Sequence, residues 1–307
     1  MQATLTKPFR ARQWTGQNSN PILGPAMILP AVVGLALFQF LPLITAVLNS
    51  LQSFSPFDQT STGWVGLENY LELLSDPSFR LALLNTFLYI ILMLGLTIPL
   101  ALVLAVLIDQ RLPGSSWTRN AIIAALAASE AVTALIWNQM YEPSSGLFNA
   151  IFHALNLPSQ PFLTSGNQAL ISIVIMSVWK DVGLPMLIFL AGIQAIPKEL
   201  PEAAELDGAN PRQIFWTITL PLLKPSVVVA LFMMTITATR MFTPILIMTQ
   251  GGPQGSTTNL ALYSYMQGFE FQSQGTASAS VVCMLMVLAL VTVAQTFILR
   301  DKGAKPS

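Results

Sequence analysis

Long apolar runs separated by short polar segments dominate this chain of 307 residues. A helix needs about 20 apolar residues to cross a hydrocarbon core of about 30 Å. Six runs are long enough, and we predict membrane spans at 26–50, 81–108, 120–140, 169–194, 225–248 and 277–299. Only helices and closed barrels satisfy their backbone hydrogen bonds in lipid, and the runs lack the alternation of barrel strands. The pattern therefore predicts an all-α, polytopic membrane protein with six transmembrane helices.

The composition agrees with a membrane protein. Hydrophobic residues make up 53% of the chain and charged residues only 9%, which is unlike an ordinary soluble domain. The 14 basic and 14 acidic residues balance, and no basic stripe exists, so we expect no nucleic acid partner. With one cysteine, Cys283, and one histidine, His153, the chain cannot build a disulfide framework or a Cys/His metal site.

The distribution of lysine and arginine predicts the orientation, because these residues are enriched in cytoplasmic connections. One set of connections holds eleven of them, whereas the opposite set holds only Arg80; the eleven are Lys7, Arg10, Arg12, Arg111, Arg119, Lys198, Arg212, Lys224, Arg300, Lys302 and Lys305. We therefore predict cytoplasmic tails at 1–25 and 300–307 around a transmembrane domain at 26–299. The loops near 51–80, 141–168 and 249–276 would face outside. Within the first of these, 63–80 is predicted to be a short helix with Trp64 and Tyr70 as interfacial anchors.

The longest cytoplasmic loop, 195–224, carries unusual polarity for this chain. It contains "EAAELDGANPRQIFWTITLP" at 202–221. Good helix formers run from Lys198 to Asp207, Gly208 is a suitable helix stop, Asn210 a suitable cap, and Pro211 suits a first helical turn. The segment is therefore predicted to be a helix, a turn and a second helix. From these residues alone, an amphipathic linker on the membrane surface is an alternative.

The same segment resembles a known motif. Glu202-Ala203-Ala204, three residues, Gly208, nine residues, Ile218, one residue and Leu220-Pro221 match the EAA loop of permease subunits of binding-protein-dependent ABC importers. Other stretches resemble the carbohydrate-uptake branch, of the maltose and glycerol-3-phosphate permease type. They are "VGLENYLELLSDPSFRLALLNTFLY" (65–89), "GLFNAIFHALNL" (146–157), "LAGIQAIPKELPEAAELDGA" (190–209) and "TQGGPQGSTTNLALYSYMQGFEF" (249–271).

The resemblance implies a type I ABC importer permease fold in the bacterial cytoplasmic (inner) membrane. It implies a heterodimeric pore with a second homologous permease subunit, two ATP-binding subunits that hold ATP and Mg, and an extracytoplasmic solute-binding protein. The solute would be a sugar, a glycoside or a related polyol, or glycerol phosphate. The chain itself would be no enzyme and bind no cofactor, which agrees with the lack of a G-x-x-x-x-G-K-[ST] motif.

The resemblance also implies roles for residues of the loop. Glu202 would make a polar contact with the ATPase, and Gly208 would form the turn between two short coupling helices. The expected ATPase-coupling residues are Glu202, Ala203, Ala204, Asp207, Gly208, Leu220 and Pro221. The outer loop at Gly251, Gly252 and Pro253 would contact the binding protein, although its composition alone favours an ordinary flexible connection.

Four charged residues fall within or beside the predicted spans: Glu130, Lys180, Asp181 and Arg240. An ionised group at the bilayer centre costs at least about 2.5–3.5 kcal/mol, so these side chains should face the bundle interior or each other. One hypothesis is a translocation path in which they act with Trp137 and Trp179 on a polyhydroxylated solute. The alternative is internal salt bridging, for instance between Lys180 and Glu130.

A secondary transporter and a membrane-embedded enzyme are alternatives to an importer permease. An ion-coupled secondary transporter of a small polar solute would also explain the helices and the buried charge, but such folds usually contain paired repeats, and no segment has a second copy here. A membrane-embedded enzyme would need a nucleophile, base or metal cluster within a span, and the sequence has none.

Overall fold

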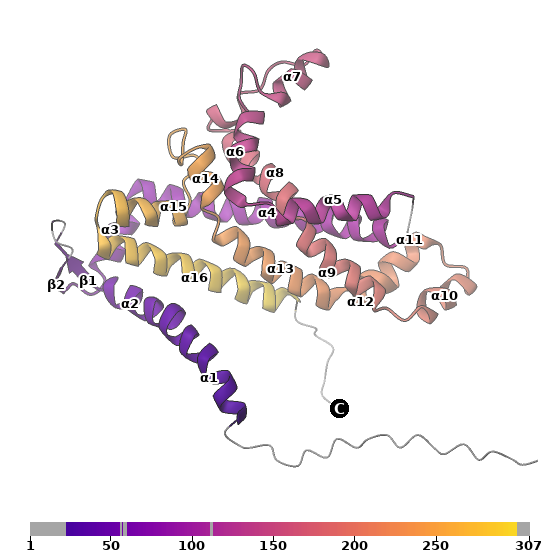
Figure 1. Cartoon of the computed structure of the whole chain (residues 1–307), viewed down its shortest axis with the longest axis horizontal. Coiled ribbons are helices and arrows are strands. Elements are labelled where there is room, and N and C mark those ends of the chain that lie inside the picture. The colour runs from indigo at the N-terminus through magenta and orange to yellow at the C-terminus, as the bar shows by residue number, and fades with distance from the viewer. Residues whose placement is uncertain (1–22, 56, 58–59, 111–112, 300–307) are drawn as a thin grey trace, which may run out of the picture. The chain divides into compact units, whose positions relative to one another are not determined.

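The computed structural model describes residues 23–55, 57, 60–110 and 113–299, most of which are helical (Figure 1). The chain divides into two compact units, Met1–Thr45 and Ala46–Ser307. The described part of the first unit comprises helix α1 (Leu23–Leu35), a π-helical turn η1 (Ala36–Phe40) and the start of α2 (Leu41–Asn49). Together, Ala26–Asn49 are long and apolar enough to cross a membrane. The predicted tails 1–25 and 300–307 lie almost wholly outside the described residues.

The second unit begins with a small hairpin in which β1 (Gln52–Phe54) pairs antiparallel with β2 (Ser61–Trp64). Helix α3 (Glu68–Ser75) follows. The prediction of one short helix over 63–80 is therefore wrong for 63–67, which are not helical, and 77–80 belong to the next helix, α4 (Pro77–Asp109). Gly63 and Gly66 have φ values of +146° and +60°, which a helix does not allow, and Trp64 belongs to the strand. Tyr70 lies on α3, where its hydroxyl is hydrogen-bonded to Ser50 Oγ at 2.7 Å.

Helix α4 (Pro77–Asp109) is the longest in the described part of the chain, with 33 residues. It begins at a well-formed cap: Asp76 Oδ1 accepts a hydrogen bond from the amide of Ser78 at 2.8 Å, and Pro77 stands where no N–H is needed. At 1.5 Å per residue the helix is about 50 Å long.

Two predicted spans are bent pairs of helices. Helices α5 (Ser115–Ala127) and α6 (Glu130–Met140) meet at 105°, because Ala128 and Ser129 adopt extended backbone conformations. Helices α8 (Ala169–Asp181) and α9 (Gly183–Gln194) meet at 45°, and Pro185 removes the amide that would bond to the carbonyl of Asp181. The spans predicted at 120–140 and 169–194 are thus each interrupted by a bend. The described residues contain four helices that are long and apolar enough to cross a membrane, or up to six spans if each bent pair is one span.

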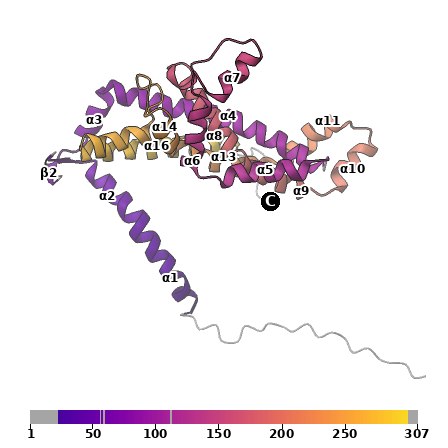
Figure 2. The same ribbon diagram turned by 45° about the horizontal axis from the view of Figure 1, so that its top comes forward.

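The remaining elements complete the second unit. They are α7 (Leu147–Ala154), η2 (Phe162–Thr164), α10 (Glu199–Leu206), α11 (Pro211–Ile214), η3 (Phe215–Thr219), α12 (Leu220–Leu222), α13 (Lys224–Thr239), α14 (Thr243–Met248), α15 (Leu260–Tyr265), η4 (Met266–Glu270) and α16 (Gln274–Leu299). Within this unit, α3 lies at one end and α10 with α11 at the other (Figure 2). Helix α4 runs between these two ends.

The core of the second unit forms around α4. One buried cluster includes Phe79, Tyr89 and Met93 of α4 and side chains from α6, α8, α14, α15 and α16. A second cluster joins α4 to α9 and α13, and its smallest members are Ala101, Ala105 and Ala230. Small side chains allow membrane helices to approach closely where lipid supplies no hydrophobic driving force. The fold therefore fixes both ends of α4 relative to the loops beside them.

Candidate coupling loop, solute path and outer pocket

The turn after α10 is fixed by local hydrogen bonds. The amide of Gly208 donates to the carbonyl of Glu205 at 3.0 Å, and that of Ala209 donates to the carbonyl of Ala204 at 2.9 Å. This pair of bonds is a Schellman motif, which requires a left-handed residue, and Gly208 supplies it with φ +87°. The predicted helix stop is confirmed.

The second helix of the loop also begins as predicted. Asn210 Oδ1 accepts the amide of Gln213 at 2.9 Å, Gln213 Oε1 accepts the amide of Asn210 at 2.8 Å, and Pro211 occupies the first turn. This reciprocal capping box satisfies amides that would otherwise have no partner. Helix α11 has only four residues but continues through η3 into α12, which contains Leu220 and Pro221. The helix, turn and helix are thus confirmed as local structure.

The exposed side chains of the loop include both charged and large apolar residues. Glu202, Ala203 and Asp207 are exposed and Ala204 is half-buried. Leu206 is 90% exposed and Trp216 61% exposed. Exposed apolar residues beside charged ones are typical of a protein contact surface. Sequence reasoning missed Leu206 and Trp216, although large apolar residues next to the motif were a usable signal.

The intramembrane charges pair differently from the example that we expected. Lys180 Nζ lies 3.4 Å from Asp181 Oδ1, both side chains are largely buried, and Glu130 is not the ion-pair partner. Glu130 instead lies in the first turn of α6, where the helix dipole favours an acidic group. It still interacts electrostatically with Lys180 and Asp181. The bend between α5 and α6, which the sequence did not reveal, sets this position.

Two predicted aromatic residues lie beside these charges. The rings of Trp137 and Trp179 are 5.5 Å apart, with Trp137 buried and Trp179 half-exposed. Tyr89 of α4, which sequence reasoning missed, is buried near Ser177, Asp181 and Glu130. Arg240 caps the C-terminus of α13, is exposed, and forms no ion pair with a described residue. The structure thus places Glu130 near Lys180 and Asp181 and packs Trp137 against Trp179, whereas Arg240 stands at the end of α13 and shares none of these contacts among the described residues.

The loop after α14, which we predict to face outside and call the outer loop, is held by many hydrogen bonds. Thr258 Oγ1 donates to the carbonyl of Gly251 at 3.1 Å, and Thr257 Oγ1 donates to that of Gly252 at 2.9 Å. Asn85 Nδ2 of α4 donates to the carbonyls of Gly255 and Thr258, each at 2.9 Å. Gly251 is buried, with φ +86°, whereas Gly252 and Pro253 are half-buried and joined by a cis peptide bond. These bonds fix the loop, in contrast to an ordinary flexible connection, and its contact with a binding protein stays a prediction.

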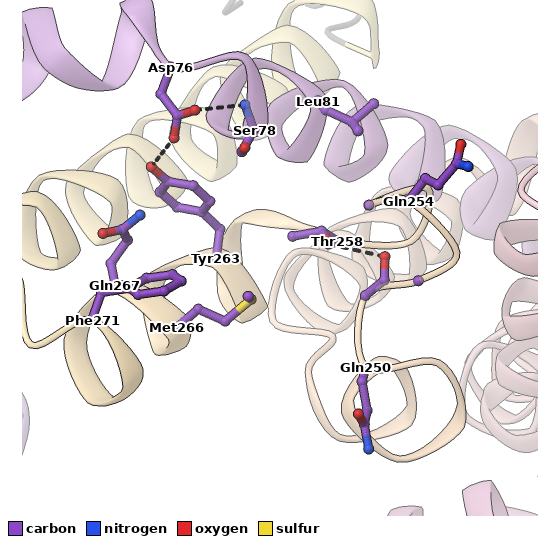
Figure 3. A pocket seen from close by; sticks show the side chains of 13 residues that line it. Asp76, Ser78, Leu81, Gln250, Gln254, Thr258, Tyr263, Met266, Gln267 and Phe271 are labelled. Atoms are coloured by element: carbon purple, nitrogen blue, oxygen red, sulfur yellow. Dashed lines mark hydrogen bonds between the residues drawn. The ribbon is translucent and has the colours of Figure 1, made fainter.

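A pocket of about 410 Å³ lies between this loop, the start of α4 and α15 with η4 (Figure 3). Asp76 Oδ2 accepts a hydrogen bond from the Tyr263 hydroxyl at 2.6 Å, while its other oxygen caps α4. Partial burial raises the pKa of Asp76, but the hydrogen bonds from Tyr263 and Ser78 lower it by more, so the pKa lies below its ordinary value. The carboxylate is therefore charged at neutral pH. Sequence reasoning did not single out this pocket.

Comparison with known proteins identifies the chain's family. Residues 78–302 match the model of the "binding-protein-dependent transport system inner membrane component" family. The trehalose/maltose transport system permease protein MalF of Thermococcus litoralis is 36% identical over 272 residues, which cover 88% of this chain and 92% of that protein. The sn-glycerol-3-phosphate transport system permease protein UgpA of Agrobacterium fabrum is 34% identical over 273 residues, which cover 88% and 92%.

The chain belongs to the family of binding-protein-dependent transport system inner membrane components. It is a permease of the ABC importer class, as the EAA motif indicated, and the comparisons give no support to a secondary transporter. The permease also has the fold of a solved bacterial ABC transporter chain involved in alginate import, with a TM-score of 0.80 at 22% identity, covering 92% of this chain and 96% of that one. The type I permease fold is consistent with this likeness.

Proposed function

We propose that this permease forms half of the pore of an ATP-driven importer for a sugar, a glycoside, a related polyol or glycerol phosphate. A second homologous permease would complete the pore, two ATP-binding subunits would hold ATP and Mg, and an extracytoplasmic binding protein would deliver the solute. The similarity to permeases named for trehalose/maltose and for sn-glycerol 3-phosphate supports this solute class. The family description itself includes dependence on a binding protein.

The exposed helix, turn and helix at 199–222 supports the proposed coupling role most directly. Its turn is built by a Schellman motif and a capping box, so it keeps its shape without support from the membrane. Glu202 and Asp207 are exposed beside Leu206, a combination that suits a cleft on a partner protein.

We assign the solute path to the charged and aromatic group around the bend between α5 and α6. Glu130, Lys180 and Asp181 offer hydrogen-bond donors and acceptors, and Trp137 with Trp179 offers aromatic surface. Arg240 is exposed at the end of α13 and is the weakest member of the proposed path. Gly252 and Pro253 are the proposed contacts with the binding protein. Gly251, which is buried, would hold the backbone of the loop in place.

Reconstitution tests the proposal. The permease, its sister permease and the ATPase subunits are placed in vesicles that contain ATP, and uptake of trehalose, maltose or sn-glycerol 3-phosphate is measured with the binding protein present. We expect uptake that requires ATP hydrolysis and the binding protein and that continues when a proton uncoupler is added. Uptake that stops with the uncoupler but continues without ATP would refute the proposal in favour of ion coupling.

A further inference from the structure

The pocket beside the outer loop has the chemistry of a carbohydrate site. Its polar side chains include Asp76, Gln267 and Thr258, and the aromatic rings of Tyr263 and Phe271 also line it. Figure 3 shows Asp76, Tyr263, Gln267 and Phe271 on one side, and Thr258, Gln250 and Gln254 on the other. Its volume of about 410 Å³ falls within the range of about 300–1,000 Å³ that is common for small-molecule sites.

Asp76 is an anchored hydrogen-bond acceptor in the pocket. Its Oδ2 accepts a hydrogen bond from the Tyr263 hydroxyl and its Oδ1 one from the Ser78 amide, and the Ser78 hydroxyl and the Phe79 amide also interact with the carboxylate. Its negative charge attracts hydroxyl groups of a ligand, and the Gln267 amide can both donate and accept. The carboxylate is held in place from both sides, so a ligand would not have to order it.

The charge of the pocket distinguishes between solutes. None of the described residues that line it is basic, and Asp76 is acidic. An anionic group such as a phosphate would lose hydration next to a carboxylate without gaining a cationic partner. Neutral hydroxyl groups meet no such penalty. The lining therefore favours a neutral sugar over glycerol phosphate.

The backbone around the pocket is fixed by hydrogen bonds and includes the outer loop, the proposed contact with the binding protein. The Asn85 side-chain amide of α4 donates hydrogen bonds to the carbonyls of Gly255 and Thr258. The Thr258 hydroxyl donates to the carbonyl of Gly251, whose backbone forms part of the pocket wall. An added Cβ at Gly251 would overlap the Thr258 side chain, so the bare glycine backbone is needed at this approach. A solute released at this loop would therefore lie next to the pocket, whose lining includes Gly251, Gly252 and Gly255 of the loop.

We propose that this pocket is an entry subsite that binds a neutral sugar released by the binding protein. The inference rests on the proposed function and on an outward-facing loop 249–276. It adds a solute site lined by Asp76, Tyr263, Gln267 and Phe271, separate from the group around Lys180. Asp76 and Gln267 would hold hydroxyl groups, and Phe271 would pack against the C–H face of the sugar ring.

Protection from thiol labelling tests the subsite directly. The chain has one native cysteine, so Gln267→Cys in a Cys283→Ala background offers a single labelling site in the pocket. Ser61→Cys, exposed on β2 and outside the pocket lining, is the matched control. The assembled transporter is labelled with a membrane-impermeant reagent in the absence of binding protein, with maltose, trehalose or sn-glycerol 3-phosphate added. At tenfold excess over its Kd, a bound sugar should slow labelling about tenfold.

We expect maltose or trehalose to slow labelling of Gln267→Cys and not of Ser61→Cys, and sn-glycerol 3-phosphate to slow neither. Phe271→Ala and Asp76→Asn should each raise the sugar concentration that gives half protection; asparagine keeps an acceptor for the α4 cap. If Gln267→Cys does not assemble, Met266→Cys on the same wall replaces it.

Three outcomes would overturn the subsite. They are a lack of protection by either neutral sugar, stronger protection by the phosphate, and protection by sugar-free binding protein where sugar alone gives none. The last result would make the pocket a protein contact. Uptake by the unsubstituted assembly is measured in the same preparations. If uptake occurs without protection, only the subsite fails, whereas a lack of ATP-driven uptake refutes the proposed function itself.

Discussion

Replacing Gly208 tests whether the shape of the coupling turn matters for transport. Gly208 has φ +87°, and an added Cβ would meet no atom within 4 Å. The cost of Gly208→Ala therefore comes from the left-handed backbone alone, about 1–2 kcal/mol for an L-residue. A cost of this size reduces the population of the turn, relative to other conformations, by roughly 5–30-fold. We expect Gly208→Ala and the bulkier Gly208→Leu to insert normally but to lose most ATP-driven uptake.

Asparagine provides the matched control for this experiment. Gly208→Asn adds a side chain similar in size to leucine, yet asparagine tolerates the left-handed region. We therefore expect Gly208→Asn to retain uptake while Gly208→Leu loses it. The assay compares uptake in vesicles with the amount of ATPase that copurifies with each variant. Wild-type uptake by Gly208→Ala would refute the conformational role, and equal loss in the asparagine and leucine variants would point to a steric contact with the partner.

Three further predictions concern the partner surface, the packing and the topology. Glu202→Lys should lower the affinity for the ATPase about 30-fold or more, which copurification measures, because losing the partner of an interfacial carboxylate costs roughly 2–5 kcal/mol. Glu68→Lys, in the first turn of α3, is the control. Gly275→Ala should lower the free energy of unfolding in detergent by about 1–3 kcal/mol, because the added Cβ would lie 2.6 Å from the backbone oxygen of Gln52. Gly95→Ala is the control: its Cβ would meet no atom within 4 Å, so this variant should not be destabilised. Introduced cysteines should be labelled from outside at positions 160 and 254 and from inside at 114 and 207.

Each of these predictions has a result that contradicts it. If the Glu202→Lys variant still forms an assembly that hydrolyses ATP in response to sugar, the result would favour the interpretation of the loop as an amphipathic linker. Equal stability of the Gly275→Ala and Gly95→Ala variants would mean that α16 and the hairpin do not pack closely. Labelling of position 207 only from outside would invert the topology and remove the ATPase contact.

Features set by local chemistry could be predicted from the sequence. Gly208, Asn210 and Pro211 each act through their own backbone preference or through a partner within a few residues, so the turn that they form was predictable. The apolar runs likewise gave the positions of the membrane spans. The family motif then supplied the importer class, which periodicity alone does not provide.

Features that depend on tertiary contacts could not be predicted. The 105° bend after Ala127 lies in an apolar run that only Ser129 and Glu130 interrupt, and these two residues do not reveal that the backbone of Ala128 and Ser129 is extended. The partner of Asp76 is Tyr263, 187 residues away, and no local pattern indicates this pairing. The position of Glu130 near Lys180 and Asp181 likewise depends on how α6 packs against α8, although the ion pair of Lys180 with its neighbour Asp181 is local.

Helix α4 has a mechanical consequence because of its length. It is about 50 Å long and exceeds a hydrocarbon core of about 30 Å, so its ends extend into water or the lipid headgroups. Asp76 stands just before its first turn and Asp109 in its last, the latter lining a second cavity of about 520 Å³ with Lys198 and Pro201 at the base of the coupling loop. A rod that pivots about its midpoint by about 10° moves each end by about 4 Å, in opposite directions. Any closure that pushes one end inward therefore widens the other.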